Sequence, residues 1–369
     1  MFRMRRTIGT GDKPRQCGFS LVELMVAITL GLLIVAGLTT LFVKNSQTRA
    51  EIERASQQIE NGRYAMQLLS DDLHNAGYLA EFDARQLATP AAKPDACAID
   101  LATLTAALPI AVQGYDNGIG APACLNDVMA GTDILVIRRA STCAVGDPGC
   151  DALVAGAPYF QASACNSAAE LGSFNVTNHY ALNTDTAQLT LHRKDCNPPI
   201  TPGTLAPIHQ YRTHIYFVAR NDKIVAGIGD GIPTLKRAEL GAEGFAIVPL
   251  VEGIQNLQIE YGIDGVDPAS GAPAPPAGTP AVYTADPDSY KACVAATCIY
   301  YWRNVVAAKI TLLARNTTIT AGYRDGKNYL LGLKADGSAN TVGPFNDGYK
   351  RHLYESVVRL DNPAGRNTP

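Results

Sequence analysis

Residues 19–43 form an uninterrupted apolar stretch, FSLVELMVAITLGLLIVAGLTTLFV, in which Glu23 is the single ionisable residue. A helix rising about 1.5 Å per residue over this length can cross a hydrocarbon core of about 30 Å. The 18 residues before it contain five basic residues and one acidic residue. Because positive flanks stay in the cytoplasm, we predict one membrane-spanning helix with the rest of the chain on the opposite side. A cleaved secretory signal is a poor fit, since its apolar core is shorter and ends in a small-residue cleavage site.

Glu23 is the residue of this stretch that needs an explanation. A carboxylate inside an apolar helix is costly and usually marks function. The plain alternative is that Glu23 lies near the membrane interface and reaches water. Cleavage between Gly18 and Phe19 would create a new amine one helical turn from Glu23, which supplies a cationic partner within the chain or in a neighbouring subunit.

The hexapeptide at residues 18–23, GFSLVE, and the apolar stretch after it resemble the class III signal of type IV prepilins and pseudopilins. The resemblance implies that residues 1–18 are a leader and that a prepilin peptidase cleaves after Gly18 and methylates Phe19. It also implies that Glu23 brings each subunit into register with the filament. The expected location is the bacterial inner membrane with the head in the periplasm, and then the pilus filament or its tip.

The helix is expected to continue beyond Val43, because no proline occurs between Pro14 and Pro90. Apolar residues and one glycine recur at alternating spacings of three and four, which indicates a narrow amphipathic stripe: Ile52, Ala55, Ile59, Gly62, Met66, Leu69, Leu73 and Ala76. We assign residues 19–78 to one long helix, with 19–43 as its transmembrane part and Gly77 as its C-terminal cap. Ala and Gly in the stripe favour packing on the chain's own sheet, with a coiled coil as the alternative.

The remaining sequence divides into a loop-rich, cysteine-containing part at 79–210 and a strand-rich part at 211–369. We predict strands at 133–139 and 187–194 in the first part, and five in the second part at 211–220, 233–240, 257–264, 304–316 and 352–360. Residues 265–282 contain five prolines and three glycines and are predicted to form an extended surface loop. The predicted fold class is α+β, with the long N-terminal helix packed on a C-terminal antiparallel sheet.

The strand-rich part carries a second resemblance. Residues 251–264 (VEGIQNLQIEYGID), the proline-rich insertion, Trp302 and the run VVAAKITLLAR are similar to the C-terminal region of PilW-type minor pilins. The similarity implies a type IV pilin-like fold and a minor pilin, at or near the pilus tip, that helps to prime assembly. Its implied partners are other minor pilins, the major pilin, the prepilin peptidase, the inner membrane and a tip adhesin. Two alternatives stay open: a minor pseudopilin of a type II secretion system, and a minor pilin that binds a ligand or DNA.

The chain has nine cysteines, an odd number that the leader explains, because Cys17 would leave with it. An even set in an exported domain predicts up to four disulfides, formed by Cys97, Cys124, Cys143, Cys150, Cys165, Cys196, Cys293 and Cys298. The short spacings favour local pairs between Cys143 and Cys150 and between Cys293 and Cys298. Otherwise eight cysteines allow roughly a hundred pairings. A zinc site is disfavoured, because Cys293-x4-Cys298 lacks a second pair.

Catalytic, cofactor and metal motifs are missing from the sequence. The six histidines form no metal-ligand spacing, and GIGDGIP at 227–233 is interpreted as a turn. Asp286 and Asp288 resemble an oxygen-ligand loop, but the EF-hand glycine and terminal glutamate are missing. We therefore expect a structural protein without catalytic residues, cofactor or metal.

Nucleic-acid binding is not expected either. Loss of the leader leaves 26 basic and 33 acidic residues, a net charge of −7, which opposes binding to phosphates. Local basic patches at Arg138 and Arg139, or at Lys236 and Arg237, are the alternative.

Overall fold

The computed structural model describes residues 18, 20–196 and 204–367 and divides into two units at Arg54 and Ala55. Helix α1 (Leu21–His74) contributes residues to both units. The first unit consists of the α1 residues up to Arg54, and the second contains the rest of α1 and the whole head. The long N-terminal helix is therefore confirmed, but it runs from Leu21 to His74 and not over the predicted residues 19–78. Gly77, predicted as its cap, has φ +70° and donates its N–H to the Arg138 carbonyl.

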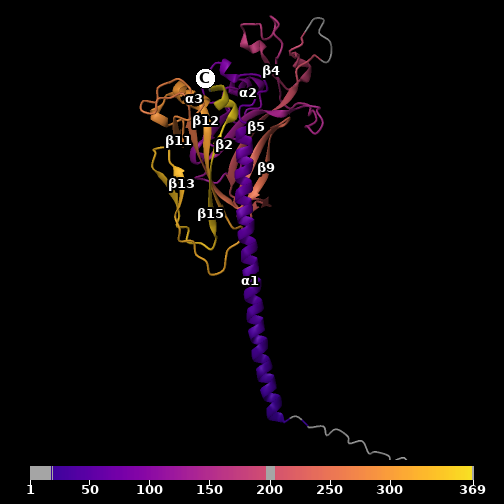
Figure 1. The fold of residues 1–369 in the computed structure, drawn as a ribbon, viewed down its shortest axis with the longest axis vertical. Coiled ribbons are helices and arrows are strands. Elements are labelled where there is room, and N and C mark those ends of the chain that lie inside the picture. Colours follow the sequence, from indigo (N-terminus) through magenta and orange to yellow (C-terminus); the bar gives the residue numbers. More distant parts are fainter. Residues whose placement is uncertain (1–17, 19, 197–203, 368–369) are drawn as a thin grey trace, which may run out of the picture. The chain divides into compact units, whose positions relative to one another are not determined.

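The first sheet of the head has seven antiparallel strands (Figure 1). Its strands are β1 (Val112–Tyr115), β2 (Ile134–Ala144), β3 (Tyr159–Ala162), β4 (Tyr180–Asn183), β5 (Ile208–Ala219), β8 (Thr234–Gly241) and β9 (Gly244–Glu252). Strand β5 is central: β2 pairs with one side of it, while β3 and β8 pair with successive parts of it. Residue 210 lies inside β5, so the loop-rich and strand-rich parts of the sequence share one sheet.

The second sheet has four antiparallel strands in the order β11-β10-β12-β15. They are β10 (Ile254–Ile263), β11 (Val282–Thr284), β12 (Val305–Arg315) and β15 (Arg351–Arg359). Two small hairpins accompany the sheets, one of β6 (Ile224–Val225) and β7 (Ile228–Gly229), the other of β13 (Tyr329–Leu333) and β14 (Ala339–Val342). The short α-helices are α2 (Leu101–Ala107), α3 (Ala295–Arg303) and α4 (Asp361–Asn367), and single 3-10 turns lie at Ala84–Gln86, Asp116–Gly118, Val176–Asn178, Thr186–Gln188 and Tyr290–Ala292.

One hydrophobic core joins the head part of α1 to both sheets. Leu69 and Leu73 of the helix are fully buried beside Leu135 of β2, Tyr216 of β5 and Ile310 of β12. Full burial of one side chain of this size stabilises the fold by about 1.5–3 kcal/mol relative to exposure. The predicted α+β arrangement, a helix packed on antiparallel strands, is confirmed.

Several sequence-predicted elements differ from the structure. The strand expected at 187–194 is absent: Asp185 caps the 3-10 turn Thr186–Gln188 by accepting the Ala187 N–H, and His192 makes only an isolated bridge with Leu205. The proline-rich loop runs to Ala281, because Val282 begins β11. Strand β9 escaped prediction although its sequence, GFAIVPLVE, is apolar. It contains Pro249, which disfavours a central strand, but β9 pairs with β8 alone and edge strands tolerate proline.

Candidate assembly surface

The hexapeptide at residues 18–23 lies in the first unit. Gly18 and Ser20 have no regular structure, Leu21 starts α1, and Phe19 lies outside the described residues. The Ser20 carbonyl accepts the Leu24 N–H, and Glu23 occupies the first turn with its side chain exposed. A carboxylate there is favoured by the positive end of the helix dipole. The geometry therefore leaves Glu23 accessible to a partner.

The large apolar side chains of residues 21–43 are 47% to 76% exposed. The most apolar part of this stretch has no buried residue, and α1 is long and apolar enough to cross a membrane. Its threonine hydroxyls are satisfied within the helix, since Thr29, Thr39 and Thr40 donate to the carbonyls of Met25, Val35 and Ala36 at 2.7, 2.7 and 2.9 Å. An apolar helix that satisfies its own polar groups suits lipid or other apolar helices as a neighbour.

In the second unit, one face of α1 is held by the head. Gln58 is buried and its side-chain N–H groups donate to the carbonyls of Ala314 and Lys350, both at 2.9 Å. Gly62 lies against the ring of Tyr354 from β15, so closely that a Cβ there would be 2.1 Å from the ring. The backbone of α1 thus approaches the four-stranded sheet more closely than any larger residue would allow.

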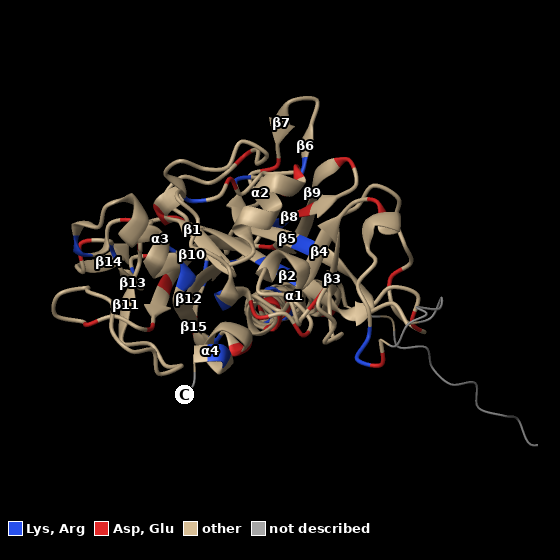
Figure 2. Cartoon of the chain, turned by 90° about the horizontal axis from the view of Figure 1, so that it is seen from above, with Lys and Arg blue, Asp and Glu red and all other residues tan. Residues whose placement is uncertain are grey.

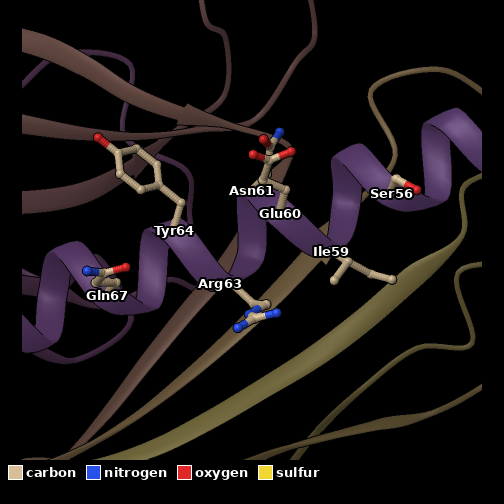
Figure 3. Close-up of a pocket in the computed structure, with 7 residues that line it drawn as sticks. All are labelled: Ser56, Ile59, Glu60, Asn61, Arg63, Tyr64 and Gln67. Atoms are coloured by element: carbon tan, nitrogen blue, oxygen red, sulfur yellow. The ribbon is translucent and has the colours of Figure 1, made fainter.

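The opposite face of the same helical segment is open. Figure 3 shows the side chains that line a shallow groove along it: Ser56, Ile59, Glu60, Asn61, Arg63, Tyr64 and Gln67. Glu60, Asn61 and Tyr64 project to one side of the helix and Ile59 and Arg63 to the other. Ile59 is 48% and Tyr64 52% exposed. Ile59 belongs to the stripe predicted to pack on the chain's own sheet, so this part of the prediction is wrong.

Asp72 connects α1 to the seven-stranded sheet and was not singled out in the sequence. Its carboxylate accepts hydrogen bonds from Arg139 Nε at 2.7 Å and the Tyr216 hydroxyl at 2.8 Å, and contacts His214 Nδ1 at 2.6 Å. Burial raises the pKa of Asp72, but the His214 hydrogen bond and the charges of His214 and Arg139 outweigh it and hold the pKa well below its usual range. Its spacing of three from Leu69 on the buried stripe was the available signal.

The structure joins the eight cysteines in four disulfides. The pairs are Cys97–Cys124, Cys143–Cys150, Cys165–Cys196 and Cys293–Cys298, with sequence separations of 27, 7, 31 and 5. Two of them are the local pairs that the spacing favours. Three of the four lie in the loop-rich part, where they restrict the unfolded chain in addition to the buried hydrophobic clusters of that part.

The motifs considered for chemistry have structural partners. Residues 227–233 begin in the turn of the β6–β7 hairpin, where Gly227 has φ +81°, and continue through β7 into irregular chain, so the interpretation as a turn holds for the start of this run. Asp288 pairs with Lys93 at 2.5 Å and accepts the Trp302 indole N–H at 2.7 Å. Within residues 18, 20–196 and 204–367, no group of three His, Cys, Asp or Glu side chains is placed to hold a metal ion.

The basic residues considered for DNA binding do not form free patches. Arg138 is buried and donates to Gln113 Oε1, while Lys236 is buried and donates to the Asp222 carbonyl. Arg237 pairs with Glu239. Lys, Arg, Asp and Glu are interspersed over the head (Figure 2). The local patches proposed from the sequence are therefore wrong.

Comparison with known proteins gives matches at both ends of the chain. Residues 215–362 match the family model of type IV pilus-assembly protein W. Residues 13–39 match the prokaryotic N-terminal methylation motif. No curated protein sequence matches the chain. Among solved structures, a type IV-like pilin from Thermus thermophilus is similar, with a TM-score of 0.20 and 16% identity over 46% of this chain and 75% of that chain.

Proposed function

Because the chain is a PilW-type prepilin-like protein, we propose that it is a minor pilin that residues 19–43 hold in the inner membrane until it joins a type IV pilus. The observation that carries the proposal is the coincidence of the methylation motif with an apolar helix that has no buried residue in its most apolar window. Such a helix needs lipid in one state and other helices in the next. The match of residues 215–362 to a pilus-assembly family supports the pilus over a type II secretion system.

Processing is the first step of the proposal. Prepilin peptidase removes residues 1–18 and methylates the new amine of Phe19. N-terminal sequencing and intact mass of membrane-extracted protein test this directly. The expected sequence begins at Phe19 with one added methyl group, and a different first residue contradicts the assignment.

Entry into the filament is the second step, and Glu23 directs it. In an apolar setting its carboxylate gains most from a cationic partner, and the amine of Phe19 in a neighbouring subunit supplies one. We expect Glu23→Ala to insert and to be processed but not to co-purify with other minor pilins. Glu53→Ala, an exposed acidic position of α1, is the matched control and retains its partners. Normal co-purification of Glu23→Ala contradicts this role.

The position in the pilus is the third part of the proposal: at or near the tip, in a complex with other minor pilins that primes assembly and carries a tip adhesin. Its support is the description of the matching family as an assembly protein. Deletion is expected to lower the number of pili per cell strongly while leaving their length and diameter unchanged. Labelling of the protein along the whole filament, rather than at one end, contradicts the tip position.

A further inference from the structure

A cavity of about 270 Å³ opens at the end of the head where α3 and α4 meet the turn after α1. Its wall is largely apolar, formed by Leu108, Pro109, Ala111, Pro276 and Pro363, with Tyr300 beside them. Three arginines line the same cavity: Arg85, Arg303 and Arg366. A small apolar cavity with convergent charged groups is the usual form of a binding site.

The three guanidinium groups are only partly neutralised. Asp83 pairs with Arg85 at 2.8 Å and lies 3.8 Å from Arg366. Arg303 donates to the Thr89 hydroxyl at 2.5 Å and to the Arg85 carbonyl at 2.6 Å, both neutral acceptors.

A second carboxylate, that of Asp264, lies behind Asn367, which donates to it at 3.1 Å. Asp264 also accepts the backbone N–H groups of Gly265, Ala277 and Gly278. Even when both carboxylates are counted, the cavity keeps an excess of one positive charge. Burial lowers the pKa of Arg303 and Arg366 below the ordinary value, as expected where positive charge lacks full compensation.

The arginines are held in place by hydrogen bonds within the head. Arg366 donates to the carbonyls of Gly77 and Phe82 at 3.2 and 2.7 Å. The guanidinium of Arg303 is fixed by its own hydrogen bonds to the Thr89 hydroxyl and the Arg85 carbonyl. A guanidinium has five N–H donors, and the described contacts of Arg303 occupy two of them. Preorganised guanidinium groups recognise carboxylates and phosphates by paired, charge-assisted hydrogen bonds.

We propose that this cavity binds a carboxylate-bearing segment of a partner protein, an acidic peptide. The prolines and Tyr300 give its backbone an apolar wall, and the arginines take its carboxylate. A nucleic acid is disfavoured, because it needs a basic track, whereas this positive charge is confined to one small cavity of a chain with net charge −3. The inference does not depend on the minor-pilin assignment.

The test uses the full-length protein in detergent and fluorescence anisotropy. One probe is a labelled glutamate-rich peptide, and its control is the same peptide with glutamine at every glutamate. We expect saturable, salt-sensitive binding of the first peptide alone, weakened about tenfold by Arg303→Gln or Arg85→Gln, which corresponds to losing one charge-assisted pair. Arg324→Gln removes an exposed arginine outside the cavity and is expected to bind as the wild type does.

Hydrogen exchange gives a second readout that does not depend on any variant folding. The bound peptide is expected to slow exchange at residues 84–89 and 300–304 of the wild-type protein. Equal binding of the two peptides, or unchanged affinity in Arg303→Gln, overturns the proposal. A labelled DNA duplex that binds in an Arg303-dependent way overturns the peptide assignment.

Discussion

Gly62 is a point of close contact between α1 and the four-stranded sheet. A methyl group at this position would meet the Tyr354 ring at 2.1 Å, so a larger residue would force the ring or the helix to shift. Glycine costs about 1 kcal/mol of helix stability relative to alanine. Packing of the Tyr354 ring over the helix therefore offsets the cost of placing a glycine inside the helix.

We therefore predict that the effect of Gly62→Ala on the free energy of unfolding changes sign when the Tyr354 ring is removed. Gly62→Ala is expected to destabilise the otherwise wild-type head by about 1 kcal/mol or more, because overpacking typically costs ~1–3 kcal/mol. In a Tyr354→Ala background the same change is expected to stabilise it by up to about 1 kcal/mol. Urea unfolding of the four proteins of this cycle measures both effects, and equal effects in the two backgrounds would rule out the contact as the cause.

The contact between α1 and the seven-stranded sheet depends on the buried charge of Asp72. Asp72→Asn is expected to cost about 3 kcal/mol, because removing one partner leaves Arg139 and His214 without their counter-charge. Asp71→Asn changes the exposed neighbouring carboxylate and is expected to stay within about 0.5 kcal/mol of wild type. Urea unfolding of both variants at pH 7 compares them directly.

The lowered pKa of Asp72 also fixes a pH dependence. The ionised Asp72 carboxylate contributes to the free energy of unfolding above its unfolded-state pKa of about 4. This contribution is lost as pH falls toward the lower folded-state pKa. Wild-type stability is expected to drop on acidification below about pH 5, and Asp72→Asn to lose less over the same range. If the free energy of unfolding falls equally with pH in the two proteins below pH 5, Asp72 does not cause the drop.

Asp133 is a second buried carboxylate, with the opposite shift. Burial, helped by the charges of Asp116 and Asp286, raises the pKa of Asp133 to about 8, although the N–H groups of Asn117 and Ile259 favour the ionised form. The folded protein then holds one proton more than the unfolded chain between about pH 4 and pH 8.

The resulting prediction is a loss of stability as pH rises through this window, at no more than about 1.4 kcal/mol per pH unit. Urea unfolding at pH 5, 6, 7 and 8 measures the slope. Asp133→Asn cannot titrate and is expected to show a flatter slope between pH 5 and 8. An unchanged slope in the variant would mean that Asp133 is ionised in the folded protein.

At the scale of elements, α1 shows what periodicity predicts and where it stops. The length of the helix and the burial of Gly62, Leu69 and Leu73 follow from the apolar spacing. The phase of the stripe is wrong toward its start, where Ile59 is exposed and Gln58 is buried instead. Gln58 is buried because two carbonyls of the sheet accept its N–H groups, a long-range pairing that no local pattern contains.

Truncation to alanine is therefore expected to destabilise the head more at the C-terminal end of the stripe than at its start. Leu69→Ala removes a fully buried side chain from the core and is expected to cost about 3 kcal/mol. Ile59→Ala, at a half-exposed position, is expected to cost less than about 1 kcal/mol. Urea midpoints of both variants check this contrast, and comparable losses would place Ile59 in the core.

The strands follow the same division. The run 304–316 is mostly apolar, includes the β-branched residues Val305, Val306, Ile310 and Thr311, and is predicted within one residue of β12 at each end. The short strands β1, β3 and β4 escaped prediction because neighbouring strands and disulfides, rather than their own sequence, hold them in place. Of the candidate site residues, Glu23 stands out from the sequence alone, whereas Asp72 and the three cavity arginines are brought together only by the fold.

At the scale of the molecule, the cysteine pairing predicts the number of free thiols before and after removal of the leader. All eight head cysteines are joined in disulfides, and Cys17 belongs to the proposed leader. Protein from wild-type cells, denatured without reductant, is expected to have no free thiol, and the precursor from cells lacking the prepilin peptidase to have one. Thiol alkylation followed by intact mass measures both, and a free thiol in the processed protein contradicts the pairing.

The threonines of the apolar segment have a consequence for its movement between surroundings. Because Thr29, Thr39 and Thr40 donate to carbonyls of their own helix, their hydroxyls need no new partner when the helix passes from lipid into a bundle of similar helices. In the assembly step proposed above, the transfer exchanges one set of dispersion contacts for another, and the threonine hydroxyls add no desolvation cost to it. If Glu23 acts as proposed, its carboxylate is then the one ionisable group of residues 19–43 that can favour one of the two surroundings over the other.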